Sequence, residues 1–237
     1  MDFNLNKVRF SYKDREKQIK IPKYLTPGLA EDIGIHIGDG SLYKCNSKRT
    51  TFEFSYASNI HEKDYLNYII KLKKKLYNLK KFKLYQKSNE INLRFNSLAI
   101  ATFYTNVVKI PAKSKVYTAR IPKLIIDSKN KEIIASFLRG IVDTDFYFCF
   151  KNKYGKLYPT LQGSFASVEL VKDLKTAFDF LGIKNNIKLL QSCPDKRFNK
   201  SWLSNIIIIS GRERVGKYLK LSGFSNHKNI ERVKKWA

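Results

Sequence analysis

The chain carries one succession of sequence patterns twice, and this repeat limits the folds that it can adopt more than any other feature. An apolar helical run occurs after Pro27 and again from Ile133, and the two runs close at Asp39 and Asp145. Each run is followed by two strand-like segments, an amphipathic helical segment, two further strand-like segments and a closing helical segment. The repeat therefore predicts an α+β fold of two pseudo-symmetric αββαββα units.

Short matches between the two halves indicate where each unit begins and ends. Residues 55–58 (SYAS) correspond to residues 164–167 (SFAS), and a Lys-Asp pair follows each, at 63–64 and at 172–173. A connector that contains proline and lysine runs from Ile110 to Lys131. We expect an N-terminal extension over residues 1–26, a first repeat over 27–115, a linker over 116–131 and a second repeat over 132–237.

The charge balance indicates the kind of partner. The 237 residues include 46 Lys and Arg but only 20 Asp and Glu, which gives a net charge of +26. The basic residues lie throughout the chain among aromatic and β-branched residues, as in a folded basic surface and unlike a disordered tail. A polyanion such as nucleic acid is the partner that this charge favours.

Cysteine usage and hydropathy indicate the compartment. The three cysteines are widely spaced and form neither a zinc pattern nor a disulfide framework, which favours a reducing environment. The N-terminus lacks the apolar stretch of a signal peptide, and no apolar run is long enough to span a membrane. We therefore expect a cytoplasmic protein that acts without a membrane.

The small residues in the two apolar runs predict how the runs pack. Gly34 and Gly38 are four positions apart, as are Gly140 and Thr144, so each pair shares one helix face and allows two helices to approach closely. Such packing brings the two helix ends, and with them Asp39 and Asp145, together. Two carboxylates beside the free carbonyl groups at helix ends, including those of Gly38 and Thr144, favour a hard divalent cation such as Mg²⁺ or Mn²⁺.

The two runs also resemble a known motif. Residues 32–40 (DIGIHIGDG) and 138–146 (LRGIVDTDF) resemble two copies of the LAGLIDADG motif of homing endonucleases and related intron maturases. The resemblance covers nearly the whole chain, and the surrounding sequence looks most like archaeal intron-encoded members. It implies a monomer whose antiparallel sheets form a saddle over duplex DNA. It also implies metal-dependent cleavage of both strands at a long, partly pseudo-palindromic intron-insertion site.

Family members usually carry a lysine after the closing helix of each half. Lys115 lies as far after Ser97 as Lys228 lies after Ser210, so the resemblance implies these two as the catalytic lysines beside Asp39 and Asp145. Lys113 competes with Lys115 for this role.

Alternation along the predicted strands separates core residues from DNA-facing residues. Phe52, Phe54, Tyr56, Leu161 and Phe165 are expected in the core. The candidates for contact with phosphates or bases are Tyr43, Lys44, Lys48, Arg49, Thr51, Glu53, Ser55, Lys83, Tyr85, Lys87, Arg94, Lys151, Lys153, Thr160, Gln162 and Ser164.

Three positions need separate comment. The second motif ends in Phe146, where the family usually has glycine, so we expect a small displacement of the second site. The first motif has Ile37, where many members have an acid. His36 shares no spacing with His61 or His227 that suggests a metal site or a triad, and it is expected to be a packing residue.

Other functions remain open at this point. An intron RNA maturase, with RNA as partner, would use the same basic surface, and a relative that has lost part of its cleavage would still bind DNA or RNA. A transcriptional regulator built on the same fold would need an added helix-turn-helix domain, for which the region before Pro27 offers little sequence. A ribosomal or structural RNA-binding protein would explain the charge but not the paired acidic helix ends.

Overall fold

The computed structural model describes residues 2–45, 51–112, 115–153, 155–195 and 200–235. The first half comprises α2 (Pro27–Gly38), β1 (Gly40–Cys45), β2 (Thr51–Asn59), α3 (Lys63–Tyr77), β3 (Lys83–Lys87), β4 (Glu90–Asn96) and α4 (Leu98–Phe103). The second half comprises α6 (Lys131–Asp145), β5 (Phe146–Lys153), β6 (Lys156–Phe165), α7 (Val168–Phe180), β7 (Asn186–Asp195), β8 (Lys200–Ser210) and α8 (Arg212–Leu221). The predicted αββαββα order is confirmed in both halves.

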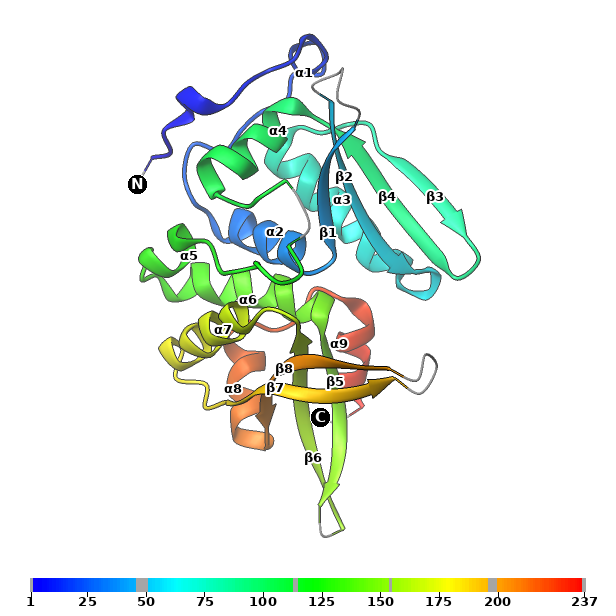
Figure 1. Ribbon diagram of the computed structural model, residues 1–237, viewed down its shortest axis with the longest axis vertical. Helices are drawn as coiled ribbons and strands as arrows, with labels where there is room; N and C mark the ends of the chain where they lie inside the picture. Colours follow the sequence, from blue (N-terminus) through cyan, green and yellow to red (C-terminus); the bar gives the residue numbers. More distant parts are fainter. Residues whose placement is uncertain (1, 46–50, 113–114, 154, 196–199, 236–237) are drawn as a thin grey trace.

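The described residues form two four-stranded antiparallel sheets with the same strand order, β1-β2-β4-β3 and β5-β6-β8-β7. Helices cover one face of each sheet, and the opposite face, which we call the outer face, is left to solvent. Helices α2 and α6 pack against each other where the two halves meet (Figure 1). The predicted α+β fold class is therefore confirmed.

Local signals explain where the two central helices begin. The Thr26 side chain accepts a hydrogen bond from the backbone N–H of Leu29 at 3.2 Å, and Pro27 occupies the first turn of α2, where a missing N–H costs nothing. The Asn130 side chain caps α6 in the same way, by accepting from Glu132 N at 2.9 Å and Ile133 N at 3.2 Å. These caps fix where each helix begins. Asp39 and Asp145 lie at the opposite, C-terminal ends of the two helices.

Close backbone contact joins α2 to α6. A methyl group on Gly34 would overlap the carbonyl oxygen of Phe137 and lie 3.0 Å from Ile141 N. A methyl group on Gly140 would overlap the carbonyl oxygen of Glu31 and lie 2.8 Å from Ile35 N. A methyl group on Gly38 would overlap the Thr144 side chain in the same way. The predicted interface of Gly34, Gly38, Gly140 and Thr144 is therefore confirmed.

The first half contains a buried polar network around Asp32. Asp32 and Lys73 form an ion pair at 2.6 Å, with both side chains fully buried, and Tyr77 and Tyr104 donate hydrogen bonds to the same carboxylate at 2.7 and 2.5 Å. Burial lowers the Lys73 pKa, while the charge of Asp32 opposes this shift. The position that corresponds to Asp32 in the second motif is Leu138, which is buried among apolar side chains. This network ties α2 to α3 and to Tyr104, which directly follows α4.

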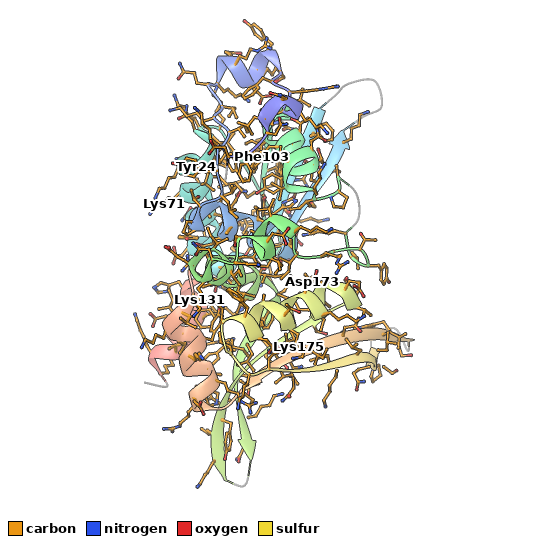
Figure 2. The ribbon with its side chains drawn as sticks, turned by 90° about the vertical axis from the view of Figure 1, so that its left-hand side faces the viewer. Tyr24, Lys71, Phe103, Lys131, Asp173 and Lys175 are labelled. Carbon is orange, nitrogen blue, oxygen red and sulfur yellow. The ribbon has the colours of Figure 1, made fainter. Side chains whose placement is uncertain are left out.

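Further contacts hold the two halves in place. Glu31 pairs with Arg139 at 2.8 Å and accepts hydrogen bonds from Tyr68 and Ser225, both at 2.7 Å. In the connector, the Arg120 guanidinium binds Asp173 of α7 through two hydrogen bonds of 3.0 and 3.1 Å. Figure 2 labels Asp173 on α7.

The described residues also form the short helix α1 (Tyr12–Glu16) in the N-terminal extension. The sequence patterns missed α5 (Lys123–Asp127) within the expected linker and α9 (His227–Lys234), which follows the closing helix α8 of the second repeat. The N-terminal residues pack on the first half, where Asp14 accepts hydrogen bonds from Ser97 Oγ at 2.7 Å and Ala99 N at 3.1 Å. No described helix is long and apolar enough to cross a membrane.

Candidate functional site

Asp39 and Asp145 lie together where α2 and α6 end. Asp39 directly follows the last turn of α2, and Asp145 is the last residue of α6. A methyl group on Gly38 would lie 2.8 Å from Oδ2 of Asp145, so the second aspartate reaches the end of the first helix. The predicted meeting of the two carboxylates is confirmed.

Burial raises the pKa of both carboxyl groups, and the charge of Asp145 adds to the shift at Asp39. Asp39 keeps part of its surface in solvent, yet burial of the carboxyl group and then the nearby charge of Asp145 raise its pKa to about 7. Burial raises the pKa of Asp145 to about 6, and the positive charge of Lys115 opposes this shift. Carboxylates crowded in this way favour a proton or a cation between them.

Lys115 is the basic residue at this site. Its ammonium group donates to the carbonyl oxygens of His36, Ile37 and Gly38, the last at 2.9 Å, and so covers the C-terminal end of α2. Burial lowers its pKa to about 8, although the charges of Asp145 and Asp39 act in the opposite direction. Lys113, the alternative to Lys115, lies outside the described residues.

The donor set fits a hard divalent cation. Among the described residues, no group of three or more His, Cys, Asp or Glu side chains gathers as a metal site. Mg²⁺ is commonly held by one or two carboxylates with water and substrate phosphates as its other ligands. Asp39 and Asp145 supply the two carboxylates, and the Gly38 carbonyl lies beside them, although here it accepts from Lys115. The Thr144 hydroxyl bonds to Gly140 O and Ile141 O within α6.

Lys228 occupies a different environment from Lys115. It lies on α9, is half exposed, and forms an ion pair with Glu62 at 2.7 Å. The negative charge of Glu62 in turn contributes to the raised pKa of Asp39. The sequence patterns did not single out Glu62, and the second half has Val171 at the corresponding place before its Lys-Asp pair. The two lysines therefore do not follow the pseudo-symmetry of the aspartates.

Asp143 has a structural role that the sequence patterns did not assign. It is buried and accepts hydrogen bonds from Ser225 N at 2.6 Å, Asn226 N at 3.0 Å and Asn229 Nδ2 at 3.2 Å. Burial raises its pKa to about 7, although these hydrogen bonds oppose the shift. Asp143 thus anchors the start of α9 to the second motif helix. The first motif has Ile37 at this position, and Ile37 lines a cavity of about 760 Å³ under the connector.

Phe146 does not disturb the end of α6. Its backbone is extended, with φ −104° and ψ 151°, a conformation that needs no glycine. Its buried ring packs against Phe165 and Phe178. The expected displacement of the second site therefore has no basis in the local backbone. His36 is a packing residue, as expected, because its ring is buried against Phe54, Tyr56 and Tyr104.

The outer face of the first sheet is polar. Strand pairing places Tyr43 beside Glu53 and Arg94 beside both Ser55 and Lys83. Glu53 accepts from Tyr43, and Arg94 pairs with Glu53 at 3.4 Å and lies over the Tyr85 ring. The residues on this face are Ser41, Tyr43, Glu53, Ser55, Ala57, Asn92, Arg94, Asn96, Lys83, Tyr85 and Lys87.

Lys44 does not share this face, and its contact with phosphates or bases stays a prediction. It is exposed but pairs with Phe52, and alternation sends its side chain to the same side of the sheet as Leu42.

The outer face of the second sheet holds Tyr147, Cys149, Lys151, Gln162 and Ser164. Lys151 Nζ donates to Gln162 Oε1 at 2.8 Å. Thr160 points to the same side but is fully buried, because neighbouring side chains cover it and its hydroxyl lies 2.9 Å from that of Ser210. Its prediction as an accessible groove residue is therefore wrong.

Some predicted residues fall outside the described part of the chain. These are Lys48 and Arg49, together with the side chains of Thr51 and Lys153. The outer face of the second sheet also contains residues that the sequence patterns did not select, namely Asn186, Lys188, Trp202, Ile206 and Ile208.

Comparison with known proteins identifies the fold. No protein-family model and no curated protein sequence matches this chain. Among solved structures, I-DmoI in complex with DNA and Mn has a TM-score of 0.55 and 19% identity, over 84% of this chain and 98% of that chain. I-SmaMI bound to uncleaved DNA target in the presence of calcium ions has a TM-score of 0.55 and 14% identity, over 89% of each chain.

A third structure, the LAGLIDADG homing endonuclease I-GzeII in complex with a DNA target, has a TM-score of 0.52 and 12% identity, over 88% of this chain and 87% of that chain. The chain therefore has the fold of the two-domain LAGLIDADG homing endonucleases, as the resemblance of its motifs predicts.

Proposed function

We propose that this chain, which has the fold of the two-domain LAGLIDADG homing endonucleases, is a site-specific DNA endonuclease that cuts both strands of an intron-insertion site. The observation that carries this proposal is the meeting of Asp39 and Asp145 at the ends of two tightly packed helices, with Lys115 beside them. The net charge of +26 and the two outer faces, both of which carry polar and basic side chains, supply a surface for a duplex. The three solved structures compared above, of I-DmoI, I-SmaMI and I-GzeII, are complexes with DNA.

Asp39 and Asp145 would hold divalent cations, Mg²⁺ or a substitute such as Mn²⁺, against the scissile phosphates. A bound cation supplies positive charge that polarises the phosphodiester and lowers the pKa of a water ligand. The chain's own contribution is to fix both carboxylates through the rigid helix pair and to keep Lys115 near the phosphate, where it stabilises developing negative charge. Because both halves lie in one chain, a monomer suffices for a long, partly pseudo-palindromic target.

Cation binding should depend on pH, because the carboxylates must lose protons. The native pKa values, about 7 for Asp39 and about 6 for Asp145, lie above the ordinary value of 3.8. The native state therefore keeps protons that the unfolded chain has lost. The metal-free protein should lose stability as pH rises from about 4 through about 7. Mg²⁺ should restore it, with an apparent affinity that rises roughly tenfold per pH unit for each proton displaced.

Thermal unfolding with and without Mg²⁺ at pH 5.5 and pH 8 measures this effect. We expect the increase in Tm caused by Mg²⁺ to be clearly larger at pH 8. The double variant D39N/D145N serves as the control, since Asp143 also titrates but its carboxylate is occupied by hydrogen bonds from Ser225, Asn226 and Asn229. An equal Mg²⁺ effect in the double variant would place the cation elsewhere.

Replacing Lys115 by methionine should lower the rate of strand cleavage about a hundredfold, because one donor to the developing charge is lost. The loss also removes a positive charge that lowers the pKa of both aspartates. The pH at which Mg²⁺ begins to stabilise the protein should therefore move upward. Single-turnover cleavage and the pH series above measure the two effects. The matched control is K123M, at an exposed residue of α5, and equal rates for the two variants would exclude Lys115 from the reaction.

The endonuclease proposal is tested on a plasmid library of diverse intron-insertion sequences, with Mg²⁺ and with EDTA. Double-strand cuts at one sequence, in Mg²⁺ alone, are the expected result. Tight binding to DNA without any cut would refute it.

The different environments of the two lysines favour one second candidate, a relative that nicks one strand or only binds. Lys228 is held by Glu62, whereas Lys115 lies at the aspartates, so of the two predicted lysines that the structure describes one is placed beside the carboxylates. A nicked product that is not converted to a linear one would support this candidate. Binding to intron RNA that promotes splicing, without DNA cleavage, would support the maturase alternative.

A further inference from the structure

The outer face of the second sheet carries two aliphatic side chains in β8. This strand is an inner strand of the sheet, because β6 and β7 pair with it on either side. Ile206 and Ile208 alternate with Ile207 and Ile209, which are fully buried in the core. Ile206 and Ile208 themselves are only partly buried and do not belong to the core cluster. They therefore project from the face that the proposed function assigns to DNA.

Strand pairing places polar side chains on both sides of each isoleucine. Ile208 lies between Gln162 of β6 and Asn186 of β7. Ile206 lies between Ser164 of β6 and Lys188 of β7. Two carboxamides thus flank one aliphatic side chain in a row across three strands.

The first sheet has a different chemistry at the corresponding place. Its inner strand β4 occupies the same position as β8 in the strand order, and it presents Asn92, Arg94 and Asn96 on the outer face. Arg94 offers a guanidinium fork, which suits the two acceptors of guanine. The pseudo-symmetric fold therefore presents two faces that differ most at their inner strands.

We propose, on the basis of the proposed DNA-binding function, that the second sheet recognises A·T pairs through the thymine methyl groups, which contact Ile206 and Ile208. In the major groove an A·T pair presents the thymine methyl group beside the donor and acceptor of adenine. The aliphatic side chain of an isoleucine makes an apolar contact with the methyl group, and the carboxamide of the flanking Gln162 or Asn186 can form hydrogen bonds with adenine. The half-site under the second sheet is therefore rich in A·T pairs, whereas Arg94 favours guanine in the other half-site.

The alternative explanation is that isoleucine is present only because β-branched residues suit strands. Threonine keeps the β-branch but replaces part of the aliphatic surface by a hydroxyl group. I206T and I208T therefore preserve the strand preference while weakening contact with a methyl group, and I208V keeps an aliphatic contact.

The first experiment selects bound duplexes from a random library in Ca²⁺ and cleaved duplexes in Mg²⁺. The base preferences are read from the bound pool and do not require cleavage. A protein that binds but does not cleave would therefore contradict the endonuclease proposal, while the recognition of A·T pairs would still be tested by the bound sequences. We expect one half-site to be enriched in A·T pairs, and I206T and I208T to weaken that preference. R94A should change the preference in the other half-site. A bound pool without an A·T-rich half-site would overturn the proposal.

The second experiment replaces each thymine of the selected site, one at a time, by deoxyuridine, which pairs identically but lacks the methyl group. Binding of the wild-type protein should weaken about fourfold at one or two positions of the A·T-rich half-site, as loss of one buried methyl predicts. At the position that contacts the substituted residue, I206T or I208T should lose less than about twofold in affinity when thymine is replaced by deoxyuridine. I208V should still show the loss of affinity seen in the wild type. Wild-type affinity that stays within twofold for every deoxyuridine would overturn the proposal, and this result does not depend on any variant folding.

Discussion

Replacing Asp39 or Asp145 by asparagine should lower the rate of double-strand cleavage roughly a thousandfold or more, which is the largest functional effect that we expect. Asparagine has the same shape but no charge, so the cation loses a ligand while the helix pair keeps its packing. Each native carboxylate is partly desolvated and has a raised pKa. Removing one negative charge should therefore leave the metal-free protein equally stable or slightly more stable near pH 8.

Single-turnover cleavage and thermal unfolding of the same preparations separate the two effects. D127N is the matched control, because Asp127 is exposed at the end of α5. We expect D39N and D145N to bind the target as the wild type does and to differ from it in cleavage alone. Cleavage that persists in both variants would show that the two aspartates do not form the active site.

Adding one methyl group at the helix crossing, by G34A or G140A, should lower the free energy of unfolding by about 3 kcal/mol or more. The new methyl groups would meet backbone atoms, namely the carbonyl oxygens of Phe137 and Glu31, which cannot turn away as a side chain can. The helices must separate, and the two carboxylates at their ends separate with them. Cleavage should therefore fall even at temperatures where the variants remain folded.

G28A is the matched control in the same helix. A methyl group at Gly28 would lie 3.7 Å from Leu72 Cδ1, which is an ordinary contact, and alanine suits a helix better than glycine does. Denaturant unfolding of the three variants should show G28A near the wild type and the other two far below it. Equal stabilities would mean that the crossing can relax without cost.

Several elements could be predicted because their signals are local. The repeat of apolar runs and strand alternation predicted the αββαββα order. The four-residue spacing of Gly34 and Gly38, and of Gly140 and Thr144, predicted the helix interface. The short helices α5 and α9 were missed because their few residues carry little periodicity. Lys44 lies on the opposite side of β1 from its neighbour Tyr43, a difference that the candidates for DNA contact did not take into account.

Other features depend on contacts between distant residues. Thr160 follows the alternation of its strand but is covered by neighbours such as Ser210 of β8. Phe146 replaces a glycine of the motif, yet the extended backbone accepts it because its ring fits the core of the second half. Glu62 lies near Asp39 and forms an ion pair with Lys228, although Glu62 and Lys228 are far apart in the chain.

The sequence by itself determined the repeated fold, the pairing of Asp39 with Asp145 and the basic character of the surface, because periodicity, spacing and charge are properties of the chain. Only the tertiary structure decided that Lys115 covers the end of α2 while Lys228 is bound by Glu62. It alone also decided that the two outer faces differ at Arg94 and at Ile206 and Ile208. The reason is physical: ion pairs, burial and the neighbours of a strand residue arise from elements that meet only when the two halves have folded against each other.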